Sequence, residues 1–295
     1  MDVRQLRSFV AVAEESHFTR AAERLGIKQS SLSSQVRLLE QEVGLPLFDR
    51  TTRRVALTDA GVFLLTRARD VIAQIDDTTS ELRGMKGDLQ GHVRIGLTTT
   101  IACVDVIGLL AHFHRRHPLV ELAVVEDLSV HLAGQLRSGT LDIGILSGAS
   151  ADELRGLNVR PFASEELVVI VPKDHRLAHA KRVGLEDLRD VDLVLPPTGA
   201  TIRSSVETAA KAQGWVPRVV CESVHVERMT ALVAAHLGLG VLPRSDAQSH
   251  ATTVAVIDLG NPSLAHDLSI CWRSRRTFPP QVRALLDHAR ELLGD

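Results

Sequence analysis

The chain has 295 residues, enough for about two domains, and its 44% hydrophobic and 24% charged residues are ordinary for a folded globular protein. This composition excludes an intrinsically disordered chain. The formal net charge of -2 gives no sign of a protein that is basic throughout, so any surface that binds nucleic acid must be local.

The first predicted elements are three short helices. Apolar side chains recur at helical spacing over residues 3–15, so this helix should pack beneath the next two. A second helix covers residues 19–25 and ends at Gly26, which has the conformational freedom that a tight turn requires. A third helix covers residues 30–43. The order of short helix, glycine turn and longer helix is typical of a helix-turn-helix.

The third helix has two different faces. Its apolar positions are Leu32, Val36, Leu39 and Val43, which lie on one side at helical spacing. Its polar positions are Ser30, Ser33, Ser34, Arg37 and Gln41. Such side chains can reach base edges and phosphates when a recognition helix enters the major groove. Taken alone, this polar face is equally consistent with the solvated side of any surface helix.

A small basic hairpin is predicted directly after the third helix. The chain turns at residues 45–48 and continues into the stretch 49–54, which carries Arg50, Arg53 and Arg54. Arginines at the tip of a hairpin are placed to follow a phosphate backbone or a minor groove. A helix-turn-helix followed by such a hairpin indicates a winged-helix DNA-binding unit.

With the hairpin included, the N-terminal sequence resembles the LysR-type transcriptional regulators. The matching residues are Ala21, Ala22, Leu25, Gln29, Leu32, Ser33, Gln35, Val36, Leu39, Glu40, Gly44, Leu47, Phe48, Arg50, Arg54, Leu57, Thr58, Ala60 and Gly61. The resemblance implies a domain over residues 1–58 that binds double-stranded promoter DNA, and it adds Gln29 and Gln35 to the candidate DNA-binding residues. Ser30 stands where the family commonly has proline, and Ser34 where an arginine often contacts DNA.

A long helix is predicted from residue 59 to about residue 85. Thr58 is suited to be its N-cap, and Asp59 in the first turn suits the helix dipole. An imperfect heptad seam runs through Leu64, Ala68, Val71, Ile75, Thr78 and Leu82. This seam could pair two DNA-binding units on a palindromic site, or the helix could lie on its own domain. The family resemblance implies a homodimer through this linker, residues 59–91, and a homotetramer.

Strands alternating with helices are predicted over residues 92–295. The strands are expected at 92–98, 120–126, 141–146, 166–171, 192–195, 219–222, 240–243, 253–259 and 268–272, and the helices at 105–116, 130–138, 201–214, 226–237 and 280–293. This alternation predicts an α/β fold with open parallel sheets. Two groups joined by extended segments indicate two lobes, residues 92–162 with 267–295, and residues 163–266.

This second half resembles the effector-binding domain of the same family, on the sequences at residues 94–97, 116–118, 136–145 and 238–243. The resemblance implies the fold of type 2 periplasmic binding proteins, with a small molecule in the cleft between the lobes.

Ligands of open α/β sheets bind at the carboxyl ends of the strands, where helix amino termini offer free N–H groups. The candidate effector-binding residues near such positions are Thr98, Thr99, Thr100, Ser129, Thr198, Thr201 and Arg203. Hydroxyls beside helix amino termini suit a small anion such as a carboxylate, with Arg203 as a countercharge. Ordinary caps, turns and a solvated arginine are the alternative. The resemblance implies that Thr100 and Ser129 contact the effector.

The sequence predicts no catalytic residue, metal or cofactor. The spacing of His112, His114 and His117 does not put them on one helix face, and no phosphate-binding loop, nucleophile elbow or dinucleotide fingerprint occurs. Three widely separated cysteines fit a reducing compartment. With no secretory signal and no apolar run of roughly 20 residues, we expect a cytoplasmic protein without membrane contacts.

The sequence therefore predicts a LysR-type transcriptional regulator, not an enzyme, in which a small organic acid modulates operator binding or promoter activation. Two alternatives stay open. One is a redox-responsive regulator acting through Cys103, which lies beside the threonine cluster, although a lone cysteine at a helix start is more often a small buried residue. The other is a solute-binding module with a DNA-binding appendage.

Overall fold

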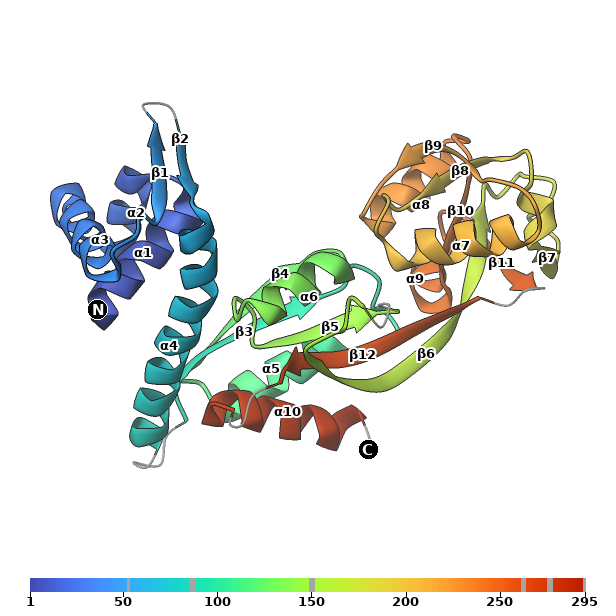
Figure 1. Ribbon diagram of the computed structural model, residues 1–295. Coiled ribbons are helices and arrows are strands. Elements are labelled where there is room, and N and C mark those ends of the chain that lie inside the picture. The colour runs from blue at the N-terminus through green and yellow to red at the C-terminus, as the bar shows by residue number, and fades with distance from the viewer. Residues whose placement is uncertain (52–53, 85–88, 149–151, 261–263, 275–277, 294–295) are drawn as a thin grey trace. The chain divides into compact units, whose positions relative to one another are not determined.

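The structure, a computed structural model, describes residues 1–295 apart from 52–53, 85–88, 149–151, 261–263, 275–277 and 294–295 (Figure 1). The chain divides into two compact units. The first unit comprises Met1–Leu89, Ser138–Thr140 and Phe278–Pro280, and the second comprises Gln90–Arg137, Leu141–Thr277 and Gln281–Asp295. Among the residues that the structure describes, no helix is both long enough and apolar enough to cross a bilayer.

The first unit contains four helices and a two-stranded sheet. They are α1 (Val3–Glu15), α2 (Phe18–Leu25), α3 (Gln29–Val43), β1 (Phe48–Thr51), β2 (Arg54–Leu57) and α4 (Asp59–Gly84). Its core forms where α1 meets the start of the hairpin, and the ring of Phe48 lies 5.3 Å from that of Phe9 and 5.9 Å from that of Phe18, measured between centroids. The three predicted helices therefore share one core with the hairpin.

The amino-terminal part of α4 packs on its own unit, contrary to the first two residues of the predicted heptad seam. Leu64 and Ala68 belong to the core of the first unit, and Ala68 is only 1% exposed. Arg69 on α4 donates to the Glu14 carboxylate of α1 at 2.8 Å, and Arg7 pairs with Asp76. Exposed apolar side chains on this helix are Val62 and Phe63, which lie outside the seam, and Val71 and Leu82, which belong to it. The face of α4 open to a partner therefore keeps Val71 and Leu82 of the predicted seam but not Leu64 and Ala68.

The second unit is an α/β structure. Its strands are β3 (Gly91–Leu97), β4 (Val120–Glu126), β5 (Ile143–Ser147), β6 (Leu157–Val171), β7 (Arg182–Gly184), β8 (Asp192–Leu195), β9 (Arg218–Glu222), β10 (Leu239–Pro243), β11 (Ala255–Gly260) and β12 (Ala265–Arg273). Its helices are α5 (Val106–Arg116), α6 (Ser129–Arg137), the 3-10 helix η1 (Leu185–Leu188), α7 (Thr201–Ala212), α8 (Val226–Ala234), α9 (Arg244–Ser249) and α10 (Pro280–Leu293).

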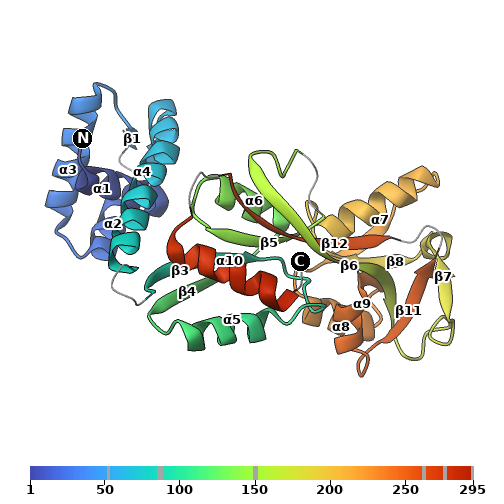
Figure 2. The ribbon, with the colours of Figure 1, turned by 90° about the horizontal axis from the view of Figure 1, so that it is seen from below.

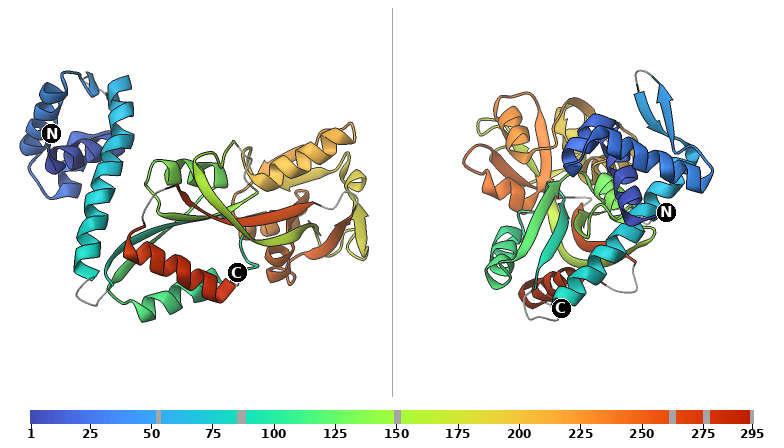
Figure 3. Two further views of the ribbon diagram at one scale, coloured as in Figure 1. Left: turned by 60° about the horizontal axis from the view of Figure 1, so that its bottom comes forward. Right: turned by 90° about the vertical axis from the view of Figure 1, so that its left-hand side faces the viewer.

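The strands join in the order β4-β3-β5-β12-β6-β10-β8-β9, with β11 paired to β6 and β7. Parallel pairing was predicted throughout, and it holds for β3 with β4 and β5, and for β8 with β9 and β10. The prediction is wrong for β6 and β12, which are antiparallel to their neighbours. These two long strands connect the lobes of the second unit, as Figures 1 and 3 show.

The change of partner along β6 marks where one lobe gives way to the other. Its residues up to Glu166 pair with β12, and those from Leu167 onward pair with β10 and β11. The first part is half exposed and the last five residues are fully buried. Only the buried end has the continuous apolar run that predicts a strand, so the sequence indicated residues 166–171 and missed the beginning of β6.

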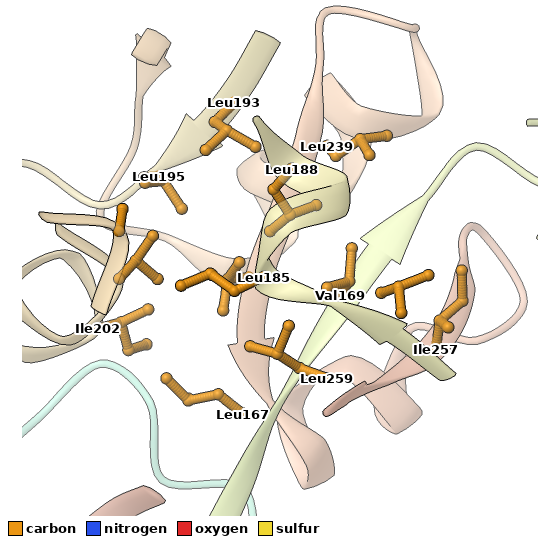
Figure 4. Packing of buried hydrophobic residues seen from close by; sticks show 14 of the residues in the cluster. Leu167, Val169, Leu185, Leu188, Leu193, Leu195, Ile202, Leu239, Ile257 and Leu259 are labelled. Atoms are coloured by element: carbon orange, nitrogen blue, oxygen red, sulfur yellow. The ribbon is translucent and has the colours of Figure 1, made fainter. Parts of the chain in front are cut away.

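Helices cover both faces of the sheet in the first lobe. α6 lies on one side of β3 and β5, whereas α5 and α10 lie on the other, as Figures 1 and 2 show. The second lobe has a core built from β6, β8, β10, β11, η1 and α7, and Figure 4 shows its side chains meeting around Leu185 and Leu188. Each lobe therefore has its own hydrophobic packing, and the two are connected through the sheet.

Candidate functional site

The turn between α2 and α3 has the geometry of a helix-turn-helix. The ring Nδ1 of His17 accepts the Thr19 N–H at 3.2 Å and so caps the start of α2. Gly26 ends this helix at a φ of 65°, a left-handed conformation that a residue with a side chain adopts at a cost. The chain reverses there without strain and enters α3 at Gln29, with Lys28 as an N-cap residue whose side chain makes no capping bond.

The residues of α3 separate as the sequence predicts. Leu32, Val36 and Leu39 are fully buried in the core of the first unit. The outer face of α3 consists of the exposed residues Gln29, Ser30, Ser34 and Arg37. Ser33 is partly buried, and its Oγ accepts a hydrogen bond from Gln29 Nε2 at 3.3 Å. The buried residues hold the helix so that this polar outer face points to solvent.

Gln35 differs from the other candidate DNA-binding residues on α3. Its side chain is partly buried, and its Oε1 accepts a hydrogen bond from the hydroxyl of Ser8, a residue of α1 that is 1% exposed. Losing this acceptor would leave a buried hydroxyl unpaired. The geometry therefore assigns Gln35 to holding α3 on α1.

The predicted basic hairpin is present as an antiparallel pair of strands. Arg50 pairs with Val55, and Thr51 with Arg54, in the backbone register of β1 and β2. Arg53 and the side chains of Arg50 and Arg54 lie outside the described residues. The base of the hairpin is held by α3, since Glu40 Oε1 accepts the backbone N–H groups of Leu47 and Phe48 at 2.9 and 3.3 Å.

In the second unit, buried hydroxyls gather at the carboxyl ends of β3 and β5. Ser147 Oγ lies 3.3 Å from Thr98 Oγ1 and 3.1 Å from Ser129 Oγ, and the Ser147 N–H donates to Ser129 Oγ at 2.9 Å. Thr100 is also buried, at 6% exposure. The structure thus brings together Thr98 and Ser129 and adds Ser147, which the sequence analysis missed. As the last residue of β5, Ser147 was open to the same argument from strand ends.

Thr201 reaches this hydroxyl cluster from the other lobe. Its Oγ1 donates to the Ser147 carbonyl at 2.9 Å and lies 3.4 Å from Ser147 Oγ. Gly148 permits the approach, since a Cβ there would lie 2.4 Å from the Thr201 methyl group. The first residue of α7 is therefore in contact with the end of β5.

The remaining predicted effector residues lie differently. Thr99 is partly buried and Thr198 is exposed. The Arg203 guanidinium contacts Glu207 and, at 3.3 Å, Glu222, and its side chain is 12% exposed. Its charge is therefore balanced by two carboxylates within the same lobe, and its surroundings are neither the solvent nor the hydroxyl cluster.

The Cys103 residue as a whole is exposed, but its sulfur is partly desolvated. Burial of the sulfur raises the pKa of the Cys103 thiol to about 12, and the carboxylate of Glu165, which accepts its hydrogen bond, adds to the effect. Because the thiolate is the nucleophile in thiol oxidation, these surroundings oppose a reactive cysteine.

Comparisons with known proteins cover both units. Residues 3–62 match the family model "Bacterial regulatory helix-turn-helix protein, lysR family", and residues 86–294 match "LysR substrate binding domain". The chain is 37% identical over 244 residues to the HTH-type transcriptional regulator ShiR of Corynebacterium glutamicum, covering 82% of each chain.

Solved structures with the same fold include a full-length variant of OxyR from Pseudomonas aeruginosa. Its TM-score is 0.77 at 28% identity, over 98% of this chain and 95% of that one. Full-length CbnR complexed with its target DNA has a TM-score of 0.68 at 25% identity, over 99% of both chains.

Proposed function

This chain belongs to the LysR-type family of DNA-binding transcriptional regulators, and we propose that α3 and the hairpin bind promoter DNA under the control of a small organic acid. The main support for DNA binding by this unit is the outer face of α3. It combines four exposed polar side chains with a helix amino end that no side chain caps. Because the proposed target is bacterial promoter DNA, we propose that the protein acts in the cytoplasm.

The outer face suits a major groove for two reasons. Gln29, Ser30 and Ser34 carry donors and acceptors that can pair with base edges. Free N–H groups and the positive end of the helix dipole at the start of α3 favour a phosphate. Arg37 from α3, with Arg50, Arg53 and Arg54 of the hairpin, would supply charge along the backbone.

Arg50→Ala and Arg53→Ala should each weaken binding to all duplexes. Each lost phosphate contact should flatten the slope of log K against log salt by about 0.9. Ser34→Ala should instead weaken binding only to duplexes with particular bases, by roughly tenfold, and leave the slope unchanged. The measurement is fluorescence anisotropy with the DNA upstream of the gene for this protein and with a shuffled duplex, over a range of salt.

The control is Arg155→Ala, which removes an exposed arginine from the second unit and should leave the slope as it is. Unchanged slopes in both hairpin variants would contradict the proposed phosphate contacts. Ser33→Ala should act base by base like Ser34→Ala. Gln35→Ala should act differently, lowering stability by about 1–2 kcal/mol because Ser8 loses its acceptor.

The proposed effector site is the hydroxyl cluster, with Thr98, Thr100, Ser129, Ser147 and Thr201 as the groups nearest to the ligand. Hydroxyls and the amino end of α6, which begins at Ser129, can donate to a carboxylate, and that is why a small organic acid is the proposed class. These groups bond to one another, and Thr201 bonds to them from the other lobe. An acid that replaces those bonds would change how the lobes meet, and a change of this kind can alter DNA binding.

Ser129→Ala should weaken binding of the acid by about tenfold, since it removes a hydroxyl that donates to the carboxylate. The measurement is the thermal shift of the purified chain against a panel of mono- and dicarboxylic acids, because a ligand of the folded state stabilises it. Thr252→Val, an exposed hydroxyl in a turn, is the control and should retain the full shift. Equal shifts in Ser129→Ala and in the unaltered chain would exclude this site.

We propose further that the chain forms a homodimer, and then a homotetramer, through the exposed apolar residues of α4. Phe63 is 69% exposed and Leu82 60% exposed, and such side chains favour burial against another copy. A two-fold symmetric dimer presents two copies of α3 to a palindromic operator.

Two other functions are weaker in comparison. A redox regulator acting through Cys103 would need a thiolate, and the surroundings of this thiol keep it protonated. Loss of the regulatory response in Cys103→Ser would nevertheless favour it. A solute-binding module with an unused DNA-binding appendage would bind acids but leave every promoter fragment unbound.

A further inference from the structure

A second group of polar side chains, separate from the hydroxyl cluster, holds the loop after β3. This loop, residues 98–103, carries the hydroxyls of Thr98 and Thr100 and ends at Cys103. Three side chains from three other elements hold it: His266 of β12, Asp246 of α9 and Glu165 of β6. Since these residues are far apart in the sequence, only the folded chain brings them to one loop.

His266 holds Thr100. Its ring is 1% exposed, and Nε2 lies 3.1 Å from the Thr100 carbonyl and 3.2 Å from Thr100 Oγ1. Because a carbonyl oxygen only accepts, Nε2 must carry the ring proton. Nδ1 is then an acceptor, with no hydrogen-bond partner among the described residues. Burial lowers the pKa of His266, so this ring stays neutral while it holds the loop.

Asp246 holds the backbone of the same loop. Its side chain is buried, at 6% exposure, and it accepts the N–H of Ala102. Its second oxygen, Oδ2, is also buried and makes no hydrogen bond to the part of the chain that the structure describes. A carboxylate in this position is poorly solvated, whereas a neutral carboxyl group could donate from Oδ2.

Glu165 is a second carboxylate, close enough to Asp246 to repel its negative charge. Its carboxylate accepts from the backbone N–H and the hydroxyl of Ser245, at 2.8 and 2.9 Å, and from the thiol of Cys103. Burial, followed by repulsion from Glu165, raises the pKa of Asp246 to about 7, against the opposing effects of the Ala102 N–H and His250. Arg244, which precedes Ser245, does not offset these carboxylates, because its positive charge is paired with Glu166 and Asp258.

We infer that Asp246 holds a proton near neutral pH, and that its neutral carboxyl group lets the loop 98–103 pack on α9. When the proton leaves, a buried carboxylate at Asp246 lies near the partly buried carboxylate of Glu165, with His266 neutral and Cys103 a protonated thiol. The repulsion is relieved if the loop and α9 move apart. The packing of the loop that carries the proposed effector hydroxyls therefore loosens as the pH rises.

The direction of the pH effect follows from proton binding. An aspartate in the unfolded chain loses its proton near pH 4, whereas the folded chain retains one until its pKa of about 7. The folded state thus binds more protons between these values, and its stability falls as the pH rises through this window and levels off above pH 7. Well above pH 7 the proton no longer contributes to the stability of the folded state.

The test is urea unfolding of the full chain at a series of pH values from about 5 to about 8.5, without DNA or effector, for the unaltered protein and for Asp246→Asn. We expect the folding equilibrium constant of the unaltered protein to fall by roughly tenfold or more between pH 5 and 7 relative to that of Asp246→Asn. Asp152→Asn, an exposed carboxylate in the same unit, is the control and should follow the unaltered protein. Identical profiles for Asp246→Asn and the unaltered protein would overturn the inference.

A second measurement does not depend on a variant that might not fold. Hydrogen exchange of the Ala102 amide in the unaltered protein, corrected for the intrinsic rate, should lose protection above pH 7. Constant protection would also overturn the inference. The importance of this loop for regulation rests on the proposed effector site, but neither measurement uses an effector, so the two proposals fail separately.

Discussion

Gly61→Ala should destabilise the first unit by about 3 kcal/mol and abolish specific DNA binding. Gly61 is buried in the first turn of α4, where a Cβ would lie 2.2 Å from the Leu47 carbonyl oxygen and 2.9 Å from Leu57 Cδ2. The carbonyl oxygen belongs to the backbone and cannot swing away as the end of a side chain could. The Leu47 carbonyl also accepts the Thr58 N–H, so moving it breaks the junction between the hairpin and α4.

The same junction explains why the loss should reach DNA binding. Thr58, the predicted N-cap of α4, is confirmed in that role, since its Oγ1 accepts the Gly61 N–H at 3.1 Å. The hydroxyl also donates to the Pro46 carbonyl at 2.7 Å. The start of α4 therefore fixes the base of the hairpin, and displacing it displaces the arginines that follow.

Thermal unfolding and a gel-shift titration measure the two effects of Gly61→Ala. The matched control is Gly134→Ala in α6, because a Cβ there meets no atom within 4 Å. That variant should gain about 0.5–1 kcal/mol from the better helix propensity of alanine and leave DNA binding unchanged. If the two alanine variants behave alike, the close approach at Gly61 has been misjudged.

Asp142→Ala should destabilise the second unit by about 2–3 kcal/mol. The Asp142 carboxylate, 10% exposed, accepts the Arg94 backbone N–H at 2.8 Å and the guanidinium Nε and Nη2 at 3.2 and 3.0 Å. Removing it takes away the acceptor of a β3 backbone N–H and the bidentate partner of the guanidinium. Because β3 leads directly into the loop 98–103, the proposed effector site should be perturbed as well.

Asp152→Ala is the matched control for Asp142→Ala. Asp152 pairs with Arg155 at 2.8 Å, but both side chains are more than 80% exposed, and such surface pairs contribute about 0.5 kcal/mol or less. Urea unfolding of both variants compares the same two residue types at opposite degrees of burial. Equal losses would mean that the Arg94 pair is worth no more than a surface pair.

The order of the helices and the inward face of α3 were predictable from the sequence. Leu32, Val36 and Leu39 recur at the period of a helix, and a buried face must be continuous along one element. Gly26 and Thr58 likewise have local meaning, since a left-handed turn and a helix N-cap are chosen by the residues at those positions. The hydroxyls at the ends of β3 and at the start of α6 followed from the alternation of strands and helices.

Tertiary structure decided which neighbour each face meets. The sequence shows that α4 has apolar positions, but Ala68 faces its own core and Phe63 faces solvent only because α1 lies where it does. In the sequence Gln35 is indistinguishable from its exposed polar neighbours, and only the structure shows its hydrogen bond to Ser8. The antiparallel course of β6 and β12 also depends on partners distant in the chain.

The polar cluster beneath the loop 98–103 shows the same limit most clearly. Thr100 and His266 are 166 positions apart, and neither has a neighbour in sequence that indicates the other. Local periodicity encodes which side of an element is apolar, because burial acts on every residue of that side. Pairing between distant polar groups depends on how complete elements pack, so it can be read only from the folded chain.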